Sequence, residues 1–129
     1  MTDKVLLKAE HVKKYYYDSD GLFKKKEKKI VDDVSLEVHE GETVGLVGES
    51  GCGKSTLGKT LIHMIPSTDG KIYFNGEELT DEAYDRYYTD MQMIFQDPLS
   101  ALNPRMTVFD IIAEPLRVCH ICEEKDIES

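Results

Sequence analysis

Residues 48–56 read Gly48-Glu49-Ser50-Gly51-Cys52-Gly53-Lys54-Ser55-Thr56 and match the phosphate-binding pattern GxxxxGK[ST] at every fixed position. A glycine-rich loop that leads directly into a helix lets successive main-chain N–H groups converge on one anion, toward which the positive end of the helix dipole also points. We expect all of these residues to surround the phosphates of a nucleotide. In this arrangement the Lys54 ammonium contacts the β- and γ-phosphates, and the Ser55 hydroxyl coordinates a bridging Mg²⁺.

The segments on either side of this loop fit the same interpretation. Residues 42–47 form a short apolar, β-branched run that is typical of a strand buried on both faces. After the loop, Leu57, Leu61 and Ile65 repeat at helical spacing, and Pro66 closes the segment. The sequence therefore predicts a strand, a loop and a helix in the order that phosphate binding requires, rather than a glycine-rich surface turn.

Composition narrows the class of protein. A chain of 129 residues can bury one core, so we expect a single domain or part of one. Its 16 basic and 25 acidic residues give a net charge of −9, which argues against a nucleic-acid partner. The sequence has no apolar run long enough to span a bilayer and no secretory signal, so its three cysteines are expected to be reduced thiols in the cytosol.

Alternating apolar residues predict two further strand pairs. Residues 5–12 and 30–38 are expected to form a hairpin, and the lysine-rich insertion at 18–29 is expected to be a solvated turn. Residues 71–76 are expected to form a strand that ends in a turn and begins a second hairpin.

The last third of the chain carries two helix-start signals. Thr80 is expected to cap a helix that carries tyrosines on one face, and Thr107 to cap a final helix that Pro115 would kink or interrupt. Between the two helices, residues 91–95 are expected to form an apolar strand that ends at Gln96.

This order of elements resembles the first half of an ABC-transporter ATPase domain, and the resemblance covers nearly the whole chain. It implies an α/β P-loop NTPase fold with an antiparallel β-subdomain and an incomplete core sheet. Within one partial domain over residues 1–129, the ATP-binding core would span 1–96 and the start of the helical subdomain 97–129. In that family a glutamine at the position of Gln96 contacts Mg²⁺ or the attacking water and connects the nucleotide to the membrane subunits.

The same resemblance assigns roles to single residues. It implies Lys54 and Gln96 as catalytic residues, Ser55 and Gln96 at the Mg²⁺, and an aromatic residue upstream of the loop stacked on the adenine. Tyr15, Tyr16 and Tyr17 are the candidates for this aromatic residue. The spacing from the preceding strand favours Tyr16, and the choice among the three stays open.

Residues 93–107 and 112–116 closely resemble the corresponding region in ATP-binding subunits of oligopeptide and dipeptide importers. The resemblance implies an ATPase that uses ATP and Mg²⁺ on the inner face of the cell membrane. Its implied partners are transmembrane permease subunits, a second ATPase subunit and an extracytoplasmic peptide-binding protein. Importers of nickel or another small solute share much of this pattern and remain an alternative.

Two other readings differ in chemistry. A P-loop kinase would share residues 42–65 but should carry an arginine-rich acceptor pocket, whereas this chain has only Arg86, Arg105 and Arg117. The second alternative is a nucleotide-binding module that does not hydrolyse ATP. It is considered because the LSGGQ-type helix start, the Walker B strand and the switch histidine of the resembled family are not among these residues. The chain alone is therefore expected to bind ATP with negligible hydrolysis, and to oligomerise or fold marginally.

Overall fold

The computed structural model describes residues 3–19 and 25–127, which form two compact units. One unit runs up to Met91 and carries the sheet and the glycine-rich loop, and the other begins at Gln92. The functional boundary expected after residue 96 stays a prediction.

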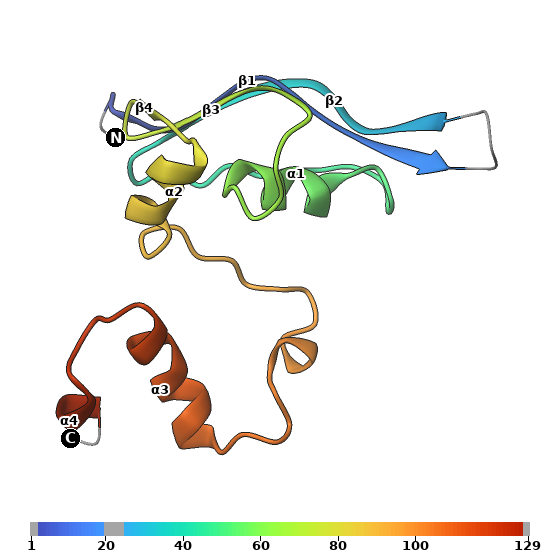
Figure 1. Cartoon of the computed structure of the whole chain (residues 1–129). Helices are drawn as coiled ribbons and strands as arrows, with labels where there is room; N and C mark the ends of the chain where they lie inside the picture. The colour runs from blue at the N-terminus through green and yellow to red at the C-terminus, as the bar shows by residue number, and fades with distance from the viewer. Residues whose placement is uncertain (1–2, 20–24, 128–129) are drawn as a thin grey trace. The chain divides into compact units, whose positions relative to one another are not determined.

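The first unit is built on a four-stranded antiparallel sheet, shown in Figure 1. Two long strands, β1 (Val5–Ser19) and β2 (Lys25–His39), form a hairpin. Strand β3 (Asp69–Phe74) pairs with the other edge of β1, and the short β4 (Glu77–Glu78) follows it, which gives the order β2-β1-β3-β4. Both predicted hairpins are thus confirmed. Asn75 and Gly76 have positive φ angles of 50° and 82°, as a tight two-residue hairpin turn requires.

The lysine-rich stretch differs from the prediction. Residues 25–29 are not a solvated turn but lie within β2, paired with residues 15–19 of β1, while residues 20–24 lie outside the described part. The pairing places aromatic rings beside lysine side chains, and the Lys29 ammonium lies 5.0 Å from the centroid of the Tyr15 ring. Tyrosine favours strands, and its ring gives the lysine a cation–π contact that a polar turn would not provide.

The hairpin is irregular in its middle. The β1–β2 register shifts between Ala9 and Val12 and again between Val12 and Lys14. His11 (φ 50°) and Asp33 (φ 58°) adopt left-handed conformations on the two strands, and His11 Nδ1 lies 2.7 Å from Asp33 Oδ1. Because each bulge inserts an extra residue, side chains beyond it change faces relative to a regular strand.

Two helices cover one face of this sheet (Figure 1). Helix α1 spans Lys54–Leu61 and α2 spans Asp81–Tyr87, with Thr80 capping α2 through its hydroxyl 3.2 Å from the Ala83 N–H. The predicted cap at Thr80 is confirmed. The core joins both helices to the sheet, and it comprises Ala9, Val12, Ile72, Phe74 and Leu79, with Leu61 and Tyr87 among the partly buried residues packed on it.

Helix α1 is shorter than the apolar spacing predicted. It ends at Leu61 instead of continuing to Pro66, because His63 takes a left-handed φ of 58° and closes the helix with a bond to the Thr60 carbonyl.

Two predicted strands do not form. Residues 42–47 and 91–95 are in no strand, and the side chains of Val47 and Ile94 are 96% and 93% exposed. A strand needs a ladder of main-chain hydrogen bonds to a neighbour. Within residues 3–19 and 25–127, neither segment has one.

The second unit is helical. It contains a 3₁₀ turn at Leu99–Ala101, α3 (Val108–Val118) and α4 (Glu124–Ile127). The predicted cap of α3 is confirmed, because Thr107 Oγ1 accepts a bond of 3.1 Å from the Asp110 N–H. Pro115 does not interrupt α3, which continues to Val118. No helix in the described ranges is both long and apolar enough to cross a bilayer.

Candidate functional site

The loop before α1 is exposed over residues 48–52, and within it the Cys52 N–H donates to the Glu49 carbonyl oxygen at 3.3 Å. Gly53 precedes the helix with φ +98°, and no side chain of the described residues caps the helix there. The first turn of α1 also carries no acidic residue. The N–H groups of a helix start need an acceptor, and an anion can supply it where no side chain does.

Gly53 allows the loop to approach β2 closely. A Cβ built on Gly53 would overlap the carbonyl oxygen of Ile30 and lie 3.2 Å from its Cγ2 atom. Gly51 also has a positive φ, +81°, but a Cβ there would meet nothing within 4 Å. Gly53, the second fixed glycine of the motif, is therefore required both by conformation and by space, whereas Gly51 is required by conformation alone.

The Lys54 ammonium lies at the centre of the loop. Its Nζ donates to the carbonyl oxygens of Gly48 at 2.5 Å and Glu49 at 2.6 Å, and lies 3.6 Å from Cys52 Sγ. A cation held here, next to the free N–H groups of the helix start, suits a polyphosphate. The loop residues thus fit the nucleotide that the sequence predicts.

The loop and β2 enclose an open depression of about 310 Å³. Most of the residues that line it belong to β2 and the loop: Ile30, Val31, Asp32, Val34, Cys52, Gly53 and Lys54. Leu46, Val47 and Leu57 complete the lining. Ser50, Ser55 and Cys52 are exposed around the loop, so their polar atoms are accessible to a ligand.

Asp32, in the wall of this depression, links the two strands of the hairpin. Its carboxylate accepts a hydrogen bond from the Tyr15 hydroxyl, and Lys29 Nζ lies 3.6 Å from it. The hydrogen bond to the carboxylate raises the pKa of Tyr15 from its ordinary 10 to about 12 and, with Lys29, lowers the pKa of Asp32.

We expect this bond to appear in the titration of the tyrosines. The folded pKa of Tyr15 is raised, so its contribution to stability is present below pH 10 and is lost as pH rises toward about 12. The tyrosinate absorbance of the chain minus that of Tyr15→Phe should show one group titrating near pH 12, and Asp32→Ala should return it toward its ordinary value. A Tyr15 that titrates normally in the unsubstituted chain would contradict the bond.

The three adjacent tyrosines are not equivalent. The hydroxyl of Tyr15 is bound to Asp32 and its ring faces Lys29, whereas the Tyr16 and Tyr17 side chains are 46% and 56% exposed. Tyr15 is therefore the least available of the three for stacking on a base, and Tyr16 remains the predicted residue.

Gln96 lies outside the unit that carries the loop. It follows the exposed residues Ile94 and Phe95 and belongs to the second unit, which begins at Gln92. The loop residues 48–56 are thus brought together by α1 and β2, and the role expected of Gln96 at the Mg²⁺ stays a prediction.

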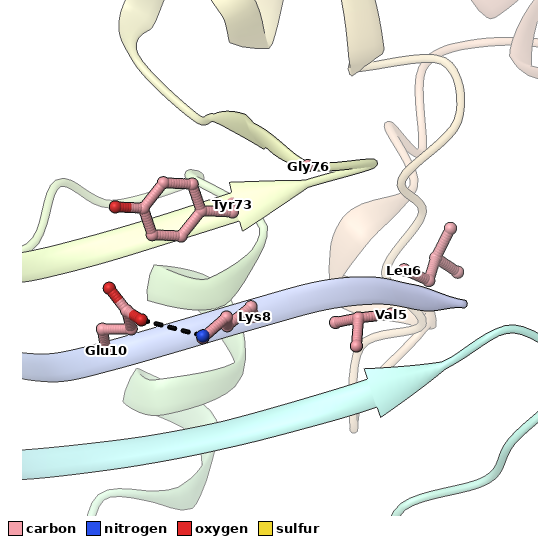
Figure 2. Close-up of a pocket in the computed structure, with 6 residues that line it drawn as sticks. All are labelled: Val5, Leu6, Lys8, Glu10, Tyr73 and Gly76. Atoms are coloured by element: carbon pink, nitrogen blue, oxygen red, sulfur yellow. Dashed lines mark ion pairs between the residues drawn. The ribbon is translucent and has the colours of Figure 1, made fainter. Parts of the chain in front are cut away.

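A second depression, of about 270 Å³, lies on the opposite face of the sheet, over β1 and β3. Figure 2 shows its lining residues, among which the Lys8 ammonium reaches the Glu10 carboxylate at 2.9 Å. Lys8 also pairs with Glu37 at 3.3 Å. Lys8 thus has one carboxylate partner on its own strand and one on β2, as is typical of a solvated sheet surface.

Sequence reasoning did not identify three contributors to the site: Ile30 behind Gly53, Asp32 beside Tyr15, and Lys14 beside Tyr16. Ile30 and Asp32 act through contacts with other elements, which an alternation pattern does not predict. Lys14 and Tyr16 are two positions apart on β1, the spacing that places side chains on one face of a strand, so this neighbour could have been found from the sequence.

The comparisons with known proteins agree with this geometry. The family model described as "ABC transporter" matches residues 31–128. An oligopeptide transport ATP-binding protein, OppF, from Bacillus subtilis is 46% identical over 97% of this chain and 40% of its own length. The OppF proteins of Escherichia coli and Salmonella typhimurium are 48% and 54% identical over 91% and 71% of this chain. The chain spans 28% to 40% of the length of these relatives.

Solved structures match at the level of the fold. The ATP-binding cassette MJ0796 bound to ADP and Pi has a TM-score of 0.76 at 23% identity, over 95% of this chain and 52% of that one. A nucleotide-free ATP-binding cassette from an ABC transporter has a TM-score of 0.64 at 27% identity, over 96% and 50% of the two chains.

Proposed function

Because this chain belongs to the ABC transporter family, we propose that it is the nucleotide-binding part of an ATP-binding subunit that drives the import of oligopeptides or dipeptides. The observation that carries the proposal is the loop at 48–54. There an uncapped helix start, a glycine packed on β2 and a central ammonium group together form a site for a polyphosphate. The peptide as transported solute is supported by the identity to the oligopeptide transport ATP-binding proteins.

The loop residues take distinct roles toward ATP. The N–H groups of 48–56 and the Lys54 ammonium would hold the phosphates, and Lys54 would exchange its two main-chain acceptors for phosphate oxygens. Ser55 Oγ, exposed in the first turn of α1, would ligate Mg²⁺, and Gln96 would complete that shell. A bound Mg²⁺ supplies charge neutralisation on the transferring phosphate.

Tyr16 is the proposed platform for the adenine. Its partly exposed ring offers contact area at a small loss of side-chain entropy. Stacking distinguishes bases poorly because every base has a π-face. We therefore expect the phosphates to supply most of the affinity.

The proposed partners follow from the same family membership. They are two transmembrane permease subunits, a second ATPase subunit and an extracytoplasmic peptide-binding protein, with this chain on the cytoplasmic side of the membrane. The assembled transporter is proposed to hydrolyse ATP. The chain of 129 residues alone is proposed to bind ATP with negligible hydrolysis.

A calorimetric titration with MgATP tests the proposal, with phosphate release measured on the same material. We expect saturable heat from the folded chain and little phosphate release. A folded chain that gives no saturable signal would contradict the nucleotide site, and rapid phosphate release would contradict the assignment of turnover to the assembly.

Cys52 offers an independent readout of the same site. Its exposed thiol lies 3.6 Å from Lys54 Nζ, so phosphates bound in the loop would cover it. We expect MgATP to slow the alkylation of Cys52, measured by peptide mass spectrometry. Cys119 and Cys122 belong to the second unit and serve as internal controls that should label at the same rate with and without nucleotide. Unchanged labelling of Cys52 at saturating MgATP would count against the site.

A further inference from the structure

Lys14 has an unusual pair of contacts. Its Nζ donates a hydrogen bond of 2.7 Å to the carbonyl oxygen of Pro66, and the same ammonium lies 5.1 Å from the centroid of the Tyr16 ring. The segment after α1 therefore fixes the ammonium, and the ammonium in turn lies against one face of the ring.

The hairpin places this pair on the side that carries α1 and the loop. Lys14 lies opposite Val31, which is buried, and Tyr16 lies opposite Lys28. Lys28 is two residues from Ile30, whose carbonyl contacts Gly53, so the cross-strand partner of Tyr16 is about 7 Å along β2 from that contact. Tyr16 is thus within the span of a nucleotide whose phosphates occupy the loop.

Lys14 differs from the other paired lysines of the sheet. Lys8, Lys13 and Lys71 each lie within ion-pair distance of a carboxylate, whereas Lys14 has no ion pair within residues 3–19 and 25–127. Its anchor is a neutral carbonyl, which leaves the positive charge free to attract the electron-rich face of the ring.

We propose that Lys14 is a positioning residue for nucleotide binding, which holds the Tyr16 ring by one face and leaves its other face to the base. This inference rests on the proposed function, because it deepens the role of Tyr16 in that site. ATP is then long enough for its base to lie on the second face of the Tyr16 ring while its phosphates lie in the loop. Lys14 itself is not required to touch the nucleotide.

Calorimetric titrations of the full chain with two ligands test this role. MgATP carries a base, and magnesium tripolyphosphate does not. We expect Lys14→Met to weaken MgATP binding about two- to fivefold, the range for loss of an exposed cation–π contact, and to leave tripolyphosphate binding unchanged. Lys14→Arg should restore MgATP binding, because a guanidinium also packs on aromatic faces.

Lys71→Met is the matched control, because it removes one positive charge from the opposite face of the sheet, where Lys71 pairs with Glu78. It should change neither affinity. Equal weakening of both ligands by Lys14→Met would make Lys14 a phosphate contact, tighter MgATP binding would make it an obstacle to the base, and no change would make it a surface residue. Each of these three results overturns the inference while the nucleotide site stands. A chain that binds neither ligand overturns the proposed function itself.

Discussion

Alanine at position 53 is expected to lower MgATP affinity by roughly 100-fold, since two separate costs of about 1–2 and 1–3 kcal/mol add. Gly53 has φ +98°, where a Cβ strains the main chain, and that Cβ would overlap the Ile30 carbonyl. The loop would have to move off β2, and the N–H groups of the helix start would no longer converge on one anion. Calorimetric titration of Gly53→Ala measures the loss.

Gly51→Ala is the matched control within the same loop. Gly51 shares the left-handed conformation, with φ +81°, but a Cβ there meets open space. We expect only the cost of the strain, about 1–2 kcal/mol or roughly tenfold in affinity. Circular dichroism of both variants reports whether the sheet persists. If Gly51→Ala and Gly53→Ala weakened binding equally, contact with β2 would not shape the site.

Lys54→Ala is expected to have an effect of similar size by a different route. It leaves the main chain of α1 in place and removes the ammonium that holds the loop centre. Loss of hydrogen bonds between charged groups costs about 3 kcal/mol, which corresponds to roughly 100-fold weaker MgATP binding. Tripolyphosphate should lose affinity by a similar factor, because the contact is to phosphate and not to the base.

Lys59→Ala controls for the change in net charge. Lys59 lies in the last turn of the same helix, away from the loop. It should bind MgATP within about twofold of the unsubstituted chain, the effect expected of a surface charge. If Lys54→Ala bound MgATP as tightly as Lys59→Ala, the central ammonium would have no part in nucleotide binding.

The features that the sequence predicted correctly are local ones. The caps at Thr80 and Thr107 form as expected, because a hydroxyl at a helix start satisfies an N–H group within three residues. The glycine-rich loop and the start of α1 at Lys54 also follow their local motif, and only the close approach of Gly53 to Ile30 of β2 adds a distant partner. The fold class and the family are confirmed by the match of residues 31–128.

What the sequence did not predict depends on distant partners. Residues 42–47 have the composition of a buried strand, but composition does not supply a neighbouring strand, and none is paired with them in the described part. The contacts of Asp32 with Tyr15 and of Lys14 with Pro66 join residues that are 17 and 52 positions apart along the chain. No short motif encodes contacts over such separations.

The two carbonyl oxygens that receive the Lys54 ammonium have a consequence for the energetics of any incoming polyanion. The cation is already solvated by its own backbone, so an entering ligand replaces existing bonds rather than adding new ones. The net gain in binding free energy is the difference between hydrogen bonds to the two carbonyl oxygens and hydrogen bonds to the oxygens of the polyanion. It favours the polyanion, because hydrogen bonds between two charged groups are stronger. The same two hydrogen bonds hold the Lys54 side chain inside the loop before association, so less of its conformational entropy remains to be lost when a polyanion binds.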